Sequence, residues 1–434
     1  MREYKGLCYS DDFQILYEPK SGIKEFEEIE FHPNLEVIEA FTFADCTIKN
    51  IKFPNKYIRL KHGAFFRCNI ENMNYPERFG SIDETLFEYT KIKNLYFEDE
   101  SCKYVCLSNI EIENLYFSEK IDSITSPPGY NIKNYHVDKK NKVFYTQNGD
   151  LYHNSTLVLK GRNNSEILPI ETIGEFAFYK YNDALKTINL PKTVKEIKNN
   201  AFTYATLKEI IFPKYLEKIE KDVFYKTRTI KPLEFPKFLK EVSPEFLDGF
   251  DGNFSIAKDD DFFTIEDHVI YDKNKSTIFY YPKTNKNTVF VVPNTVKNLK
   301  PYLFENKYLK KISFEEGNEL ITISSQAIHA LNVTEICSNR PCRFESAAAL
   351  SVRKGTFYKD VYFASDAFSH LFELNITKKA RENFYEVCGH QLIKALDINT
   401  IESLDEIIEK SASFKEINNK VNEIKKDIYD EPEL

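Results

Sequence analysis

The chain has 434 residues, and its 42% of hydrophobic and 15% of aromatic residues are sufficient for a packed core. The formal net charge of −8 is mild, which argues against a general nucleic-acid-binding face. The sequence has no long apolar run, and its N-terminal stretch lacks the apolar segment of a secretory signal. We therefore expect no membrane span and a cytoplasmic location.

A repeated phrase follows a short N-terminal stretch, residues 1–25, which we interpret as a cap. The phrase is an apolar residue, two variable residues, an apolar residue, one variable residue and another apolar residue, usually followed by proline. A further apolar residue and, five positions later, a large residue complete it. Neighbouring copies are 22 to 24 residues apart, as in "LKTINLPKTVKEIKNNAFTY" from Leu185 and "LKEIIFPKYLEKIEKDVFYK" from Leu207. Internal repetition is therefore the dominant signal.

Each position of the phrase has a physical reason. Ile210 and Phe212 alternate with variable residues, which is the pattern of a strand. Proline then ends the strand because it donates no hydrogen bond. The last two positions bring a short turn or helix back onto the strand, and stacked units bury a common core. These final pairs are Ile38 with Phe43, Leu60 with Phe65, Ile82 with Phe87, Ile173 with Phe178, Ile197 with Phe202, Ile219 with Phe224, Val242 with Leu247, and Leu299 with Phe304.

The period is typical of leucine-rich repeats, whereas ankyrin and helical repeats need about 33 residues or more. The phrase L-x-x-I-x-[IF]-P-x-x-[VL]-x-x-I-x-x-x-[AV]-F, carried by residues 207–226, resembles the BspA-like leucine-rich repeat family. The resemblance covers roughly residues 26–376. It implies an α/β repeat solenoid, curved, with parallel strands on the concave face. It also implies protein or surface binding rather than one chemistry.

Two longer stretches, near residues 131–170 and 251–292, interrupt the repeats. "NYHVDKKNKVFYTQNGDLYHNSTLVL" from Asn134 matches "NFSIAKDDDFFTIEDHVIYDKNKSTIF" from Asn253 at an offset of 119 residues. Both look like the extended units that interrupt arrays of this family. The chain is therefore expected to be partly duplicated at a level above the single repeat.

Five asparagines fall at one position of consecutive repeats, just before an inward-facing strand residue. If the strands stack in register, their amide groups can bond to one another along the sheet. We expect this asparagine ladder to have a structural role. Its members are Asn50, Asn72, Asn94, Asn114 and Asn134.

A second row lies two residues further along the same strands, on the same exposed face. Tyrosine is enriched at protein interfaces, so this row is a candidate protein-binding strip. Its members are Lys52, Asn74, Tyr96, Tyr116 and His136. The corresponding positions of later repeats are less suggestive of a binding site.

The eight cysteines favour reduced thiols over a metal site. Cys46 and Cys68 share one repeat position, which indicates small core residues. Two further spacings loosely resemble zinc sites but lack a second cysteine pair or a nearby pair of histidines. They are the C-x3-C of Cys102 and Cys106 and the C-x4-C of Cys337 and Cys342.

No motif of a known catalytic chemistry occurs. The dinucleotide-binding G-x-G-x-x-G, the P-loop, the nucleophile elbow G-x-S-x-G and the zinc-protease H-E-x-x-H are all missing from the sequence. The eight histidines are scattered along the chain. We therefore expect no catalytic residue, no metal and no cofactor.

The repeats stop near residue 376, and residues 377–434 have a helical pattern. Apolar residues recur there at steps of three and four, which is typical of a coiled-coil seam. We expect a helical segment that caps the solenoid near residues 380–396 and offers the seam to a partner or to a second copy. The seam consists of Phe414, Ile417, Val421, Ile424 and Ile428.

These features together predict a non-enzymatic protein-binding or scaffold protein whose partner is another protein. One alternative is a structural component of a larger assembly, held by the solenoid edges and the tail. Another is a surface antigen or adhesin, which the family resemblance implies because many members have that role.

Overall fold

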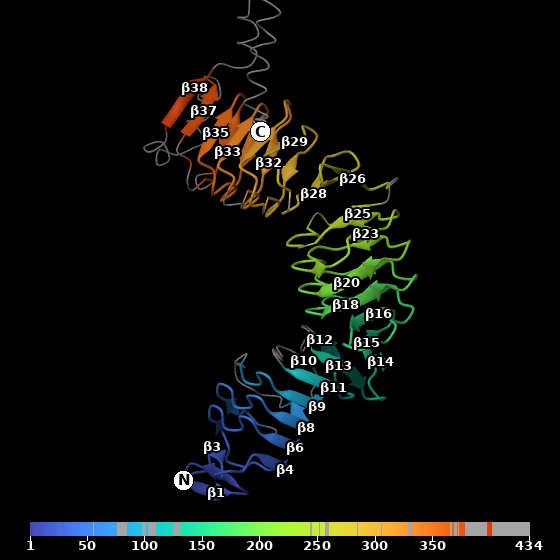
Figure 1. Ribbon diagram of the computed structural model, residues 1–434, viewed down its shortest axis with the longest axis vertical. Coiled ribbons are helices and arrows are strands. Elements are labelled where there is room, and N and C mark those ends of the chain that lie inside the picture. The colour runs from blue at the N-terminus through green and yellow to red at the C-terminus, as the bar shows by residue number, and fades with distance from the viewer. Residues whose placement is uncertain are drawn as a thin grey trace, which may run out of the picture. The chain divides into compact units, whose positions relative to one another are not determined.

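A computed structural model gives the fold (Figure 1). It describes residues 1–54, 56–75, 85–97, 101–102, 110–124, 131–243, 245–250, 252–256, 260–283, 285–304, 306–328, 332–364, 367–368, 371, 373–377 and 397–401. The chain divides into two compact units. The N-terminal unit comprises Met1–Glu241 with Gly249–Ser255, and the C-terminal unit comprises Val242–Asp248 with Ile256–Leu434.

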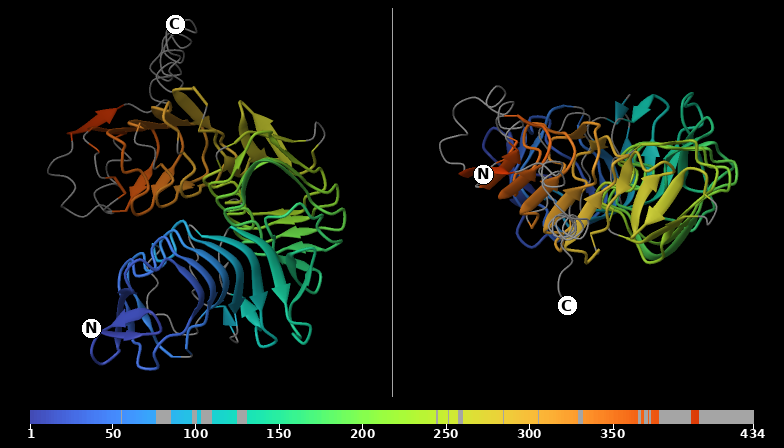
Figure 2. Two further views of the ribbon diagram at one scale, coloured as in Figure 1. Left: turned by 60° about the horizontal axis from the view of Figure 1, so that its bottom comes forward. Right: turned by 90° about the horizontal axis from the view of Figure 1, so that it is seen from above.

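A parallel sheet of six strands dominates the first part of the N-terminal unit (Figure 1 and Figure 2). Equivalent residues of successive repeats are direct neighbours in it, because each strand pairs in register with the strand one repeat later. The apolar residues of the repeat, such as Ile92, Leu95 and Phe97, are buried. The strands are β4 (Glu25–Ile29), β6 (Thr47–Ile51), β8 (Asn69–Tyr75), β9 (Lys91–Phe97), β11 (Glu111–Phe117) and β13 (Ile132–Val137).

A second sheet collects the short strands that come later in the first repeats. An antiparallel N-terminal hairpin precedes them and joins the stack because β3 pairs in parallel with β5. The strands of this sheet are β1 (Arg2–Tyr4), β2 (Leu7–Tyr9), β3 (Ile15–Pro19), β5 (Val37–Ile38) and β7 (Arg59–Leu60). A two-strand parallel ladder is formed by β10 (Ser101–Cys102) and β12 (Ser123–Ile124).

The first extended stretch folds as an antiparallel three-stranded meander, from which the following repeats continue in parallel. This sheet contains β14 (Tyr145–Gln147), β15 (Asp150–His153), β16 (Thr156–Leu159), β17 (Thr172–Ile173), β19 (Glu196–Ile197) and β21 (Lys218–Ile219). The other sheet of these repeats contains β18 (Asn182–Asn189), β20 (Thr206–Ile211) and β22 (Arg228–Thr229), which are followed by β23 (Leu233–Phe235). At the division between the units lie β24 (Glu241–Val242) and β25 (Phe254–Ile256).

The C-terminal unit repeats this plan. It begins with an antiparallel meander of β26 (Phe263–Glu266), β27 (Val269–Asp272) and β28 (Ile278–Tyr280). One parallel sheet follows with β29 (Val289–Val292), β31 (Lys311–Phe314), β33 (Glu335–Ser338), β35 (Lys354–Phe357), β37 (Glu373–Thr377) and β38 (Asp397–Ile401). The other has β30 (Asn298–Leu299), β32 (Ile321–Ile323), β34 (Cys342–Phe344) and β36 (Val361–Phe363).

A column of phenylalanine rings runs through the core of the N-terminal unit. Phe178 and Phe202 are stacked with ring centroids 4.5 Å apart, and Phe202 and Phe224 follow at 5.7 Å. All three rings are closed to solvent. Of the earlier predicted pair of Ile82 and Phe87, only Phe87 lies among the described residues. The stacking follows from the repeat itself, because one sequence position falls at one place in every coil.

The α/β prediction is wrong for the described residues, which contain no helix. The segment around a core phenylalanine such as Phe43 or Phe202 is a pair of turns instead. The residues two before and two after it have a left-handed backbone, as at Phe41 (φ 58°) and Asp45 (φ 62°) around Phe43, and at Asn200 and Tyr204 around Phe202. A right-handed helix cannot continue through such residues. The turns also bond to the next coil, for example from the Phe43 amide to the Ala64 carbonyl at 2.9 Å.

The helical prediction for residues 377–434 is likewise wrong where the structure describes them. Asp397–Ile401 is strand β38, which pairs in parallel with β37 and so continues the sheet. The cap near residues 380–396 and the seam of Phe414, Ile417, Val421, Ile424 and Ile428 lie outside the described residues. No described segment forms a helix with the length and hydrophobicity of a membrane span.

Candidate binding face on the N-terminal sheet

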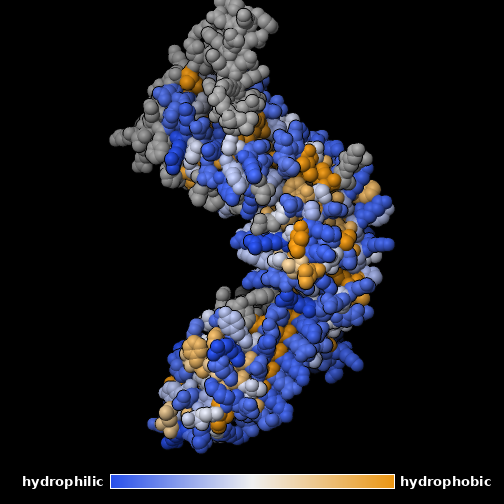
Figure 3. All heavy atoms as spheres, viewed as in Figure 1, coloured by the Kyte–Doolittle hydropathy of each residue, from blue (hydrophilic) through white to orange (hydrophobic). Residues whose placement is uncertain are grey.

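The six-stranded parallel sheet of β4, β6, β8, β9, β11 and β13 is called the β4–β13 sheet below. Its outward-facing side chains form straight rows across the sheet, because the strands are paired in register. One row alternates in charge along its whole length, and we call it the charge row. Its members are Glu27, Lys49, Glu71, Lys93, Glu113 and Lys133. Figure 3 shows the corresponding surface as largely hydrophilic, with a narrow apolar stripe between hydrophilic side chains.

Neighbouring members of the charge row form ion pairs between coils. The Lys49 ammonium lies 2.7 Å from Glu27, that of Lys93 lies 2.9 Å from Glu71, and that of Lys133 lies 3.8 Å from Glu113. The hydrogen bond from Lys93 lowers the pKa of Glu71, so this carboxylate stays ionised under mildly acidic conditions. Alternation avoids the like-charge contacts that stacking identical repeats would produce.

A groove of about 1280 Å³ runs beside the charge row. One wall is the charge row, and the other is the row two residues closer to the strand starts. The latter wall consists of Glu25, Thr47, Asn69, Lys91, Glu111 and Asn131. The groove crosses the whole sheet, so a ligand in it can touch several coils at once.

Arg162 closes the end of this groove beyond β13. Its guanidinium donates to the Asn131 side chain at 2.8 Å and to the Asn182 carbonyl, and it lies over the Tyr181 ring. These bonds attach the groove end to the coils on both sides. The arginine is therefore held in place rather than being a mobile surface cation.

The five asparagines are joined by amide hydrogen bonds. Asn72 donates to Asn50 at 2.9 Å, Asn94 donates to Asn72 at 2.9 Å, and Asn114 donates to Asn94 at 3.1 Å. Asn134 donates to Asn114 at 3.3 Å. Each interior asparagine side chain is thus hydrogen-bonded to both neighbouring asparagines, which fixes the register of the strands beneath the exposed face.

Three members of the candidate strip form one stack of rings. Tyr96 lies on Tyr116 with centroids 4.8 Å apart, and Tyr116 lies on His136 at 4.6 Å, with interplanar angles of 18° and 15°. Nε2 of His136 also lies within hydrogen-bond distance, 3.1 Å, of the side-chain oxygen of Asn114. Partial burial lowers the pKa of His136 below its ordinary value.

The two other members of the strip make different contacts and do not belong to this stack of rings. Asn74 bonds to the backbone of the preceding coil, accepting from the Phe53 amide at 2.7 Å and donating to its carbonyl at 3.3 Å. Lys52 is exposed. The strip is therefore an aromatic stack next to a structural asparagine and a surface cation.

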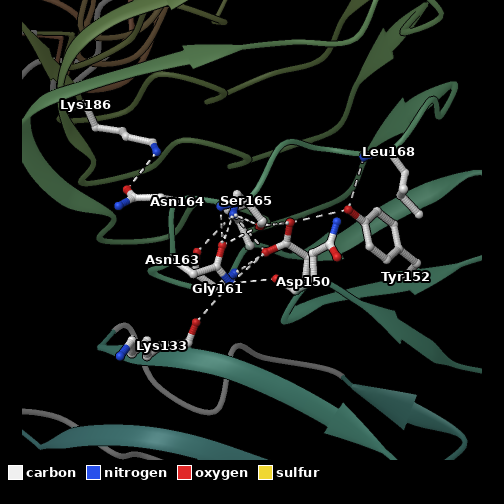
Figure 4. Close-up of polar contacts among 11 residues, drawn as sticks. Lys133, Asp150, Tyr152, Gly161, Asn163, Asn164, Ser165, Leu168 and Lys186 are labelled. Atoms are coloured by element: carbon white, nitrogen blue, oxygen red, sulfur yellow. Dashed lines mark hydrogen bonds and ion pairs between the residues drawn. The ribbon is translucent and has the colours of Figure 1, made fainter.

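A buried polar cluster lies at the groove end (Figure 4), where Lys160 donates to the groove-lining Asn163 at 2.8 Å. The Lys160 ammonium lies 2.8 Å from Asp150, and both side chains are closed to solvent at 1% and 0% exposure. Asp150 also accepts from the Gly161 amide at 3.0 Å and from the Ser165 hydroxyl at 3.1 Å. Burial raises the pKa of Asp150 and lowers that of Lys160, while their mutual attraction offsets both shifts.

The sequence analysis missed the charge row and this buried pair. A signal for the first was present, since the second position of the strand phrase reads Glu, Lys, Glu, Lys, Glu, Lys from Glu27 to Lys133. The buried pair has no such signal, because Asp150 and Lys160 look like ordinary hairpin residues until the fold encloses them.

Most of the thiols that the structure describes lie among core residues, whereas Cys8 is partly exposed. Cys46 and Cys68 are buried, and burial raises the pKa of Cys68 to about 12. Cys342 is also buried and lies 3.0 Å from the Ser338 hydroxyl. The Cys106 position and the Cys102 side chain lie outside the described part. Among described residues, no group of three His, Cys, Asp or Glu side chains is arranged to hold a metal ion.

Comparison with protein families gives one match. The family described as "BspA type Leucine rich repeat region" matches six copies over residues 21–134, 171–288 and 272–373. This match covers more than half of the chain and confirms the resemblance predicted from the repeated phrase. No curated protein matches the chain.

Several solved structures are similar to the chain at low sequence identity. The pneumococcal vaccine antigen PcpA is 13% identical with a TM-score of 0.32, over 91% of this chain and 98% of that chain. A leucine-rich repeat protein from Eubacterium ventriosum is 13% identical with a TM-score of 0.31, over 82% and 83%. A leucine rich cell surface protein from Faecalibacterium prausnitzii is 12% identical with a TM-score of 0.28, over 100% and 98%.

Proposed function

The chain belongs to the BspA-type leucine-rich repeat family, and from this premise we propose that it binds another protein through the exposed face of β4–β13. Stacked repeats offer such a face because each coil adds one strand to a continuous surface. The proposal assigns the chain a binding role and no chemistry of its own.

The observation that carries the proposal is the stack of Tyr96, Tyr116 and His136. Tyr96 has 36% of its surface exposed although it is a large aromatic residue on a regular strand. Each ring is held by the next at less than 5 Å, so little side-chain entropy remains to be lost when a partner binds. Rigid aromatic groups of this kind are preferred anchors at protein interfaces.

The neighbouring groove supports the same face as the binding surface. It combines isoleucine side chains such as Ile48, Ile70 and Ile92 with charged walls, and it crosses all the strands. Interfaces commonly join an apolar or aromatic centre to a polar rim. The stack and the groove lie on opposite sides of the asparagine ladder, which gives them a common rigid support.

The experiment compares two double variants as baits. Tyr96→Ala with Tyr116→Ala removes two rings of the stack. Tyr204→Ala with Tyr225→Ala removes a matched edge-to-face pair, with centroids 5.8 Å apart, from the turn side of the same unit. Both baits and the wild-type chain are used for affinity capture from native extract, after thermal unfolding shows that all three are folded.

We expect the control variant to recover the same partner as the wild-type chain and the Tyr96/Tyr116 variant to recover at most about a tenth as much, as is typical of the loss of hot-spot residues. Equal recovery by both variants would contradict the proposal and move the binding surface elsewhere. The identity of the recovered protein would separate a scaffold from a component of an assembly or an adhesin.

A further inference from the structure

Besides pairing neighbouring side chains, the charge row is complementary in charge to its own reverse. It has an even number of alternating charges and therefore ends in opposite charges, Glu27 at β4 and Lys133 at β13. When such a row is turned end for end, each charge takes the place of a charge of opposite sign. A second copy of the same row, turned end for end, is therefore its electrostatic complement.

We propose that the face of β4–β13 binds a second copy of this chain, related by a two-fold axis that lies in the interface and runs parallel to the strands. The inference rests on the proposed function and names the partner of the same face. The axis passes between β8 and β9, the middle strands of the sheet. A self-complementary patch of this kind is what an isologous dimer requires.

The axis pairs each charge with its opposite on the second copy. Glu71 faces Lys93, Lys49 faces Glu113, and Glu27 faces Lys133, and symmetry repeats each contact. The other two-fold axis in the interface plane, along the row, would set every residue against itself. That arrangement brings six pairs of like charges together, so the charge pattern selects the first axis.

The candidate strip is also compatible with this axis. Reversal places Lys52 opposite Tyr116, whose ring faces are covered by Tyr96 and His136 but whose hydroxyl oxygen can accept a hydrogen bond from the ammonium. It places Asn74 opposite Tyr96, and Glu30, one position beyond β4, opposite His136. No contact of this row brings two like charges together.

The intramolecular ion pairs leave room for contacts between copies. The Glu27 and Lys49 side chains are 85% and 53% exposed, so each can accept a further opposite charge. Exposed pairs of this type contribute little on their own. A second copy would remove them from water and extend each pair into an alternating network of four side chains.

The size of the face sets the strength of the dimer. Six strands about 4.8 Å apart and seven residues of about 3.3 Å each give a face of roughly 550 Å² per copy. The total of about 1,100 Å² lies near the lower limit of specific interfaces and fits a weak dimer. Because its contacts are charged, the dimer should weaken as salt screens them.

The test is charge complementation between two full-length variants, measured by sedimentation at low ionic strength. Glu71→Lys sets the new lysine against Lys93 of the second copy, and Lys93→Glu sets the new glutamate against Glu71 of the second copy. Each variant alone should therefore dimerise more than about tenfold more weakly than the wild-type chain. Mixing the two variants restores opposite charges at both central contacts. We expect the mixture to regain wild-type dimerisation as a heterodimer.

This rescue separates the proposal from a folding effect, because each variant keeps its own altered intramolecular ladder in the mixture. Glu209→Lys and Lys231→Glu, which alter a matched pair at 2.9 Å outside this face, serve as controls and should dimerise as the wild-type chain does. A wild-type chain that is monomeric over the whole concentration range would overturn the proposal, and so would a mixture without rescue. Capture of a different protein that depends on Tyr96 and Tyr116 would still support the proposed function in that case.

Discussion

Asp150 and Lys160 form a buried ion pair for which the chain contains its own uncharged counterpart. In the second meander Val269 occupies the place of Asp150, since both begin the middle strand. Tyr281 occupies the place of Lys160, because it follows Tyr280 opposite Ile270 as Lys160 follows Leu159 opposite Leu151. Val269 and Tyr281 are both buried. The meander therefore folds with or without the ion pair, whose particular contribution is to hold residues 161–165 at the groove end.

The pair should behave asymmetrically under mutation. Lys160→Met leaves the Asp150 carboxylate buried without its cation, and we expect a loss of about 3–5 kcal/mol in the free energy of unfolding. Asp150→Val together with Lys160→Met removes both charges, as in the second meander, and should recover at least half of that loss. Urea unfolding measures both values. A double variant as unstable as Lys160→Met alone would show that the hydrogen bonds to the loop, rather than the unpaired charge, dominate.

The phenylalanine column makes a prediction about the core. Phe202 lies between two stacked rings, so Phe202→Ala opens a cavity that neighbouring coils cannot fill. We expect a loss of about 3–5 kcal/mol, and a similar loss for Phe224→Ala. Leu185→Ala is the control, since its side chain is 85% exposed and the change should cost less than about 0.5 kcal/mol. Losses below about 1 kcal/mol at both phenylalanines would contradict a continuous buried column.

Much of this core was predictable, because a repeated position becomes a repeated place in the stack. The strands around Ile92 and Ile210 and the column through Phe202 follow directly from the spacing of apolar residues. The turn conformation was not predictable in the same way. Asp45, Tyr204 and Lys226 have a left-handed backbone, yet none of them is glycine, the residue by which this conformation is usually recognised.

On the candidate face, only those rows could be predicted whose residue types or spacing stand out in the sequence by themselves. Tyr96 and Tyr116 stand out by residue type, and the spacing of the asparagines indicates their ladder. The complementarity of the charge row can be recognised only when the register of the six strands and the first and last strands of the sheet are known. The buried Asp150–Lys160 pair needs the folded meander, since charge burial is a property of the tertiary structure.

The asparagine ladder should be least tolerant of change at its centre. Asn94→Ala removes two side-chain bonds and leaves the Asn72 carbonyl oxygen and the Asn114 amide without their ladder partners. We expect a loss of about 1–3 kcal/mol in the free energy of unfolding. Asn134→Ala removes the last side chain of the ladder and breaks only the ladder bond to Asn114. Its loss in the free energy of unfolding should therefore be smaller. Equal losses in chemical denaturation would contradict cooperative support along the row.

His136 should make the stability of the N-terminal unit depend on pH. Burial lowers its folded-state pKa below the ordinary value of 6.5, so protons bind more tightly to the unfolded chain. Its contribution is therefore present above about pH 6.5 and is lost as the pH falls through the folded-state pKa. His136→Tyr keeps an aromatic ring next to Tyr116 and cannot be protonated in this range. We expect the wild-type melting temperature to fall between pH 7.5 and 5 by more than that of His136→Tyr, as measured by calorimetry, and identical pH profiles would show that the ring is freely protonated in the folded chain.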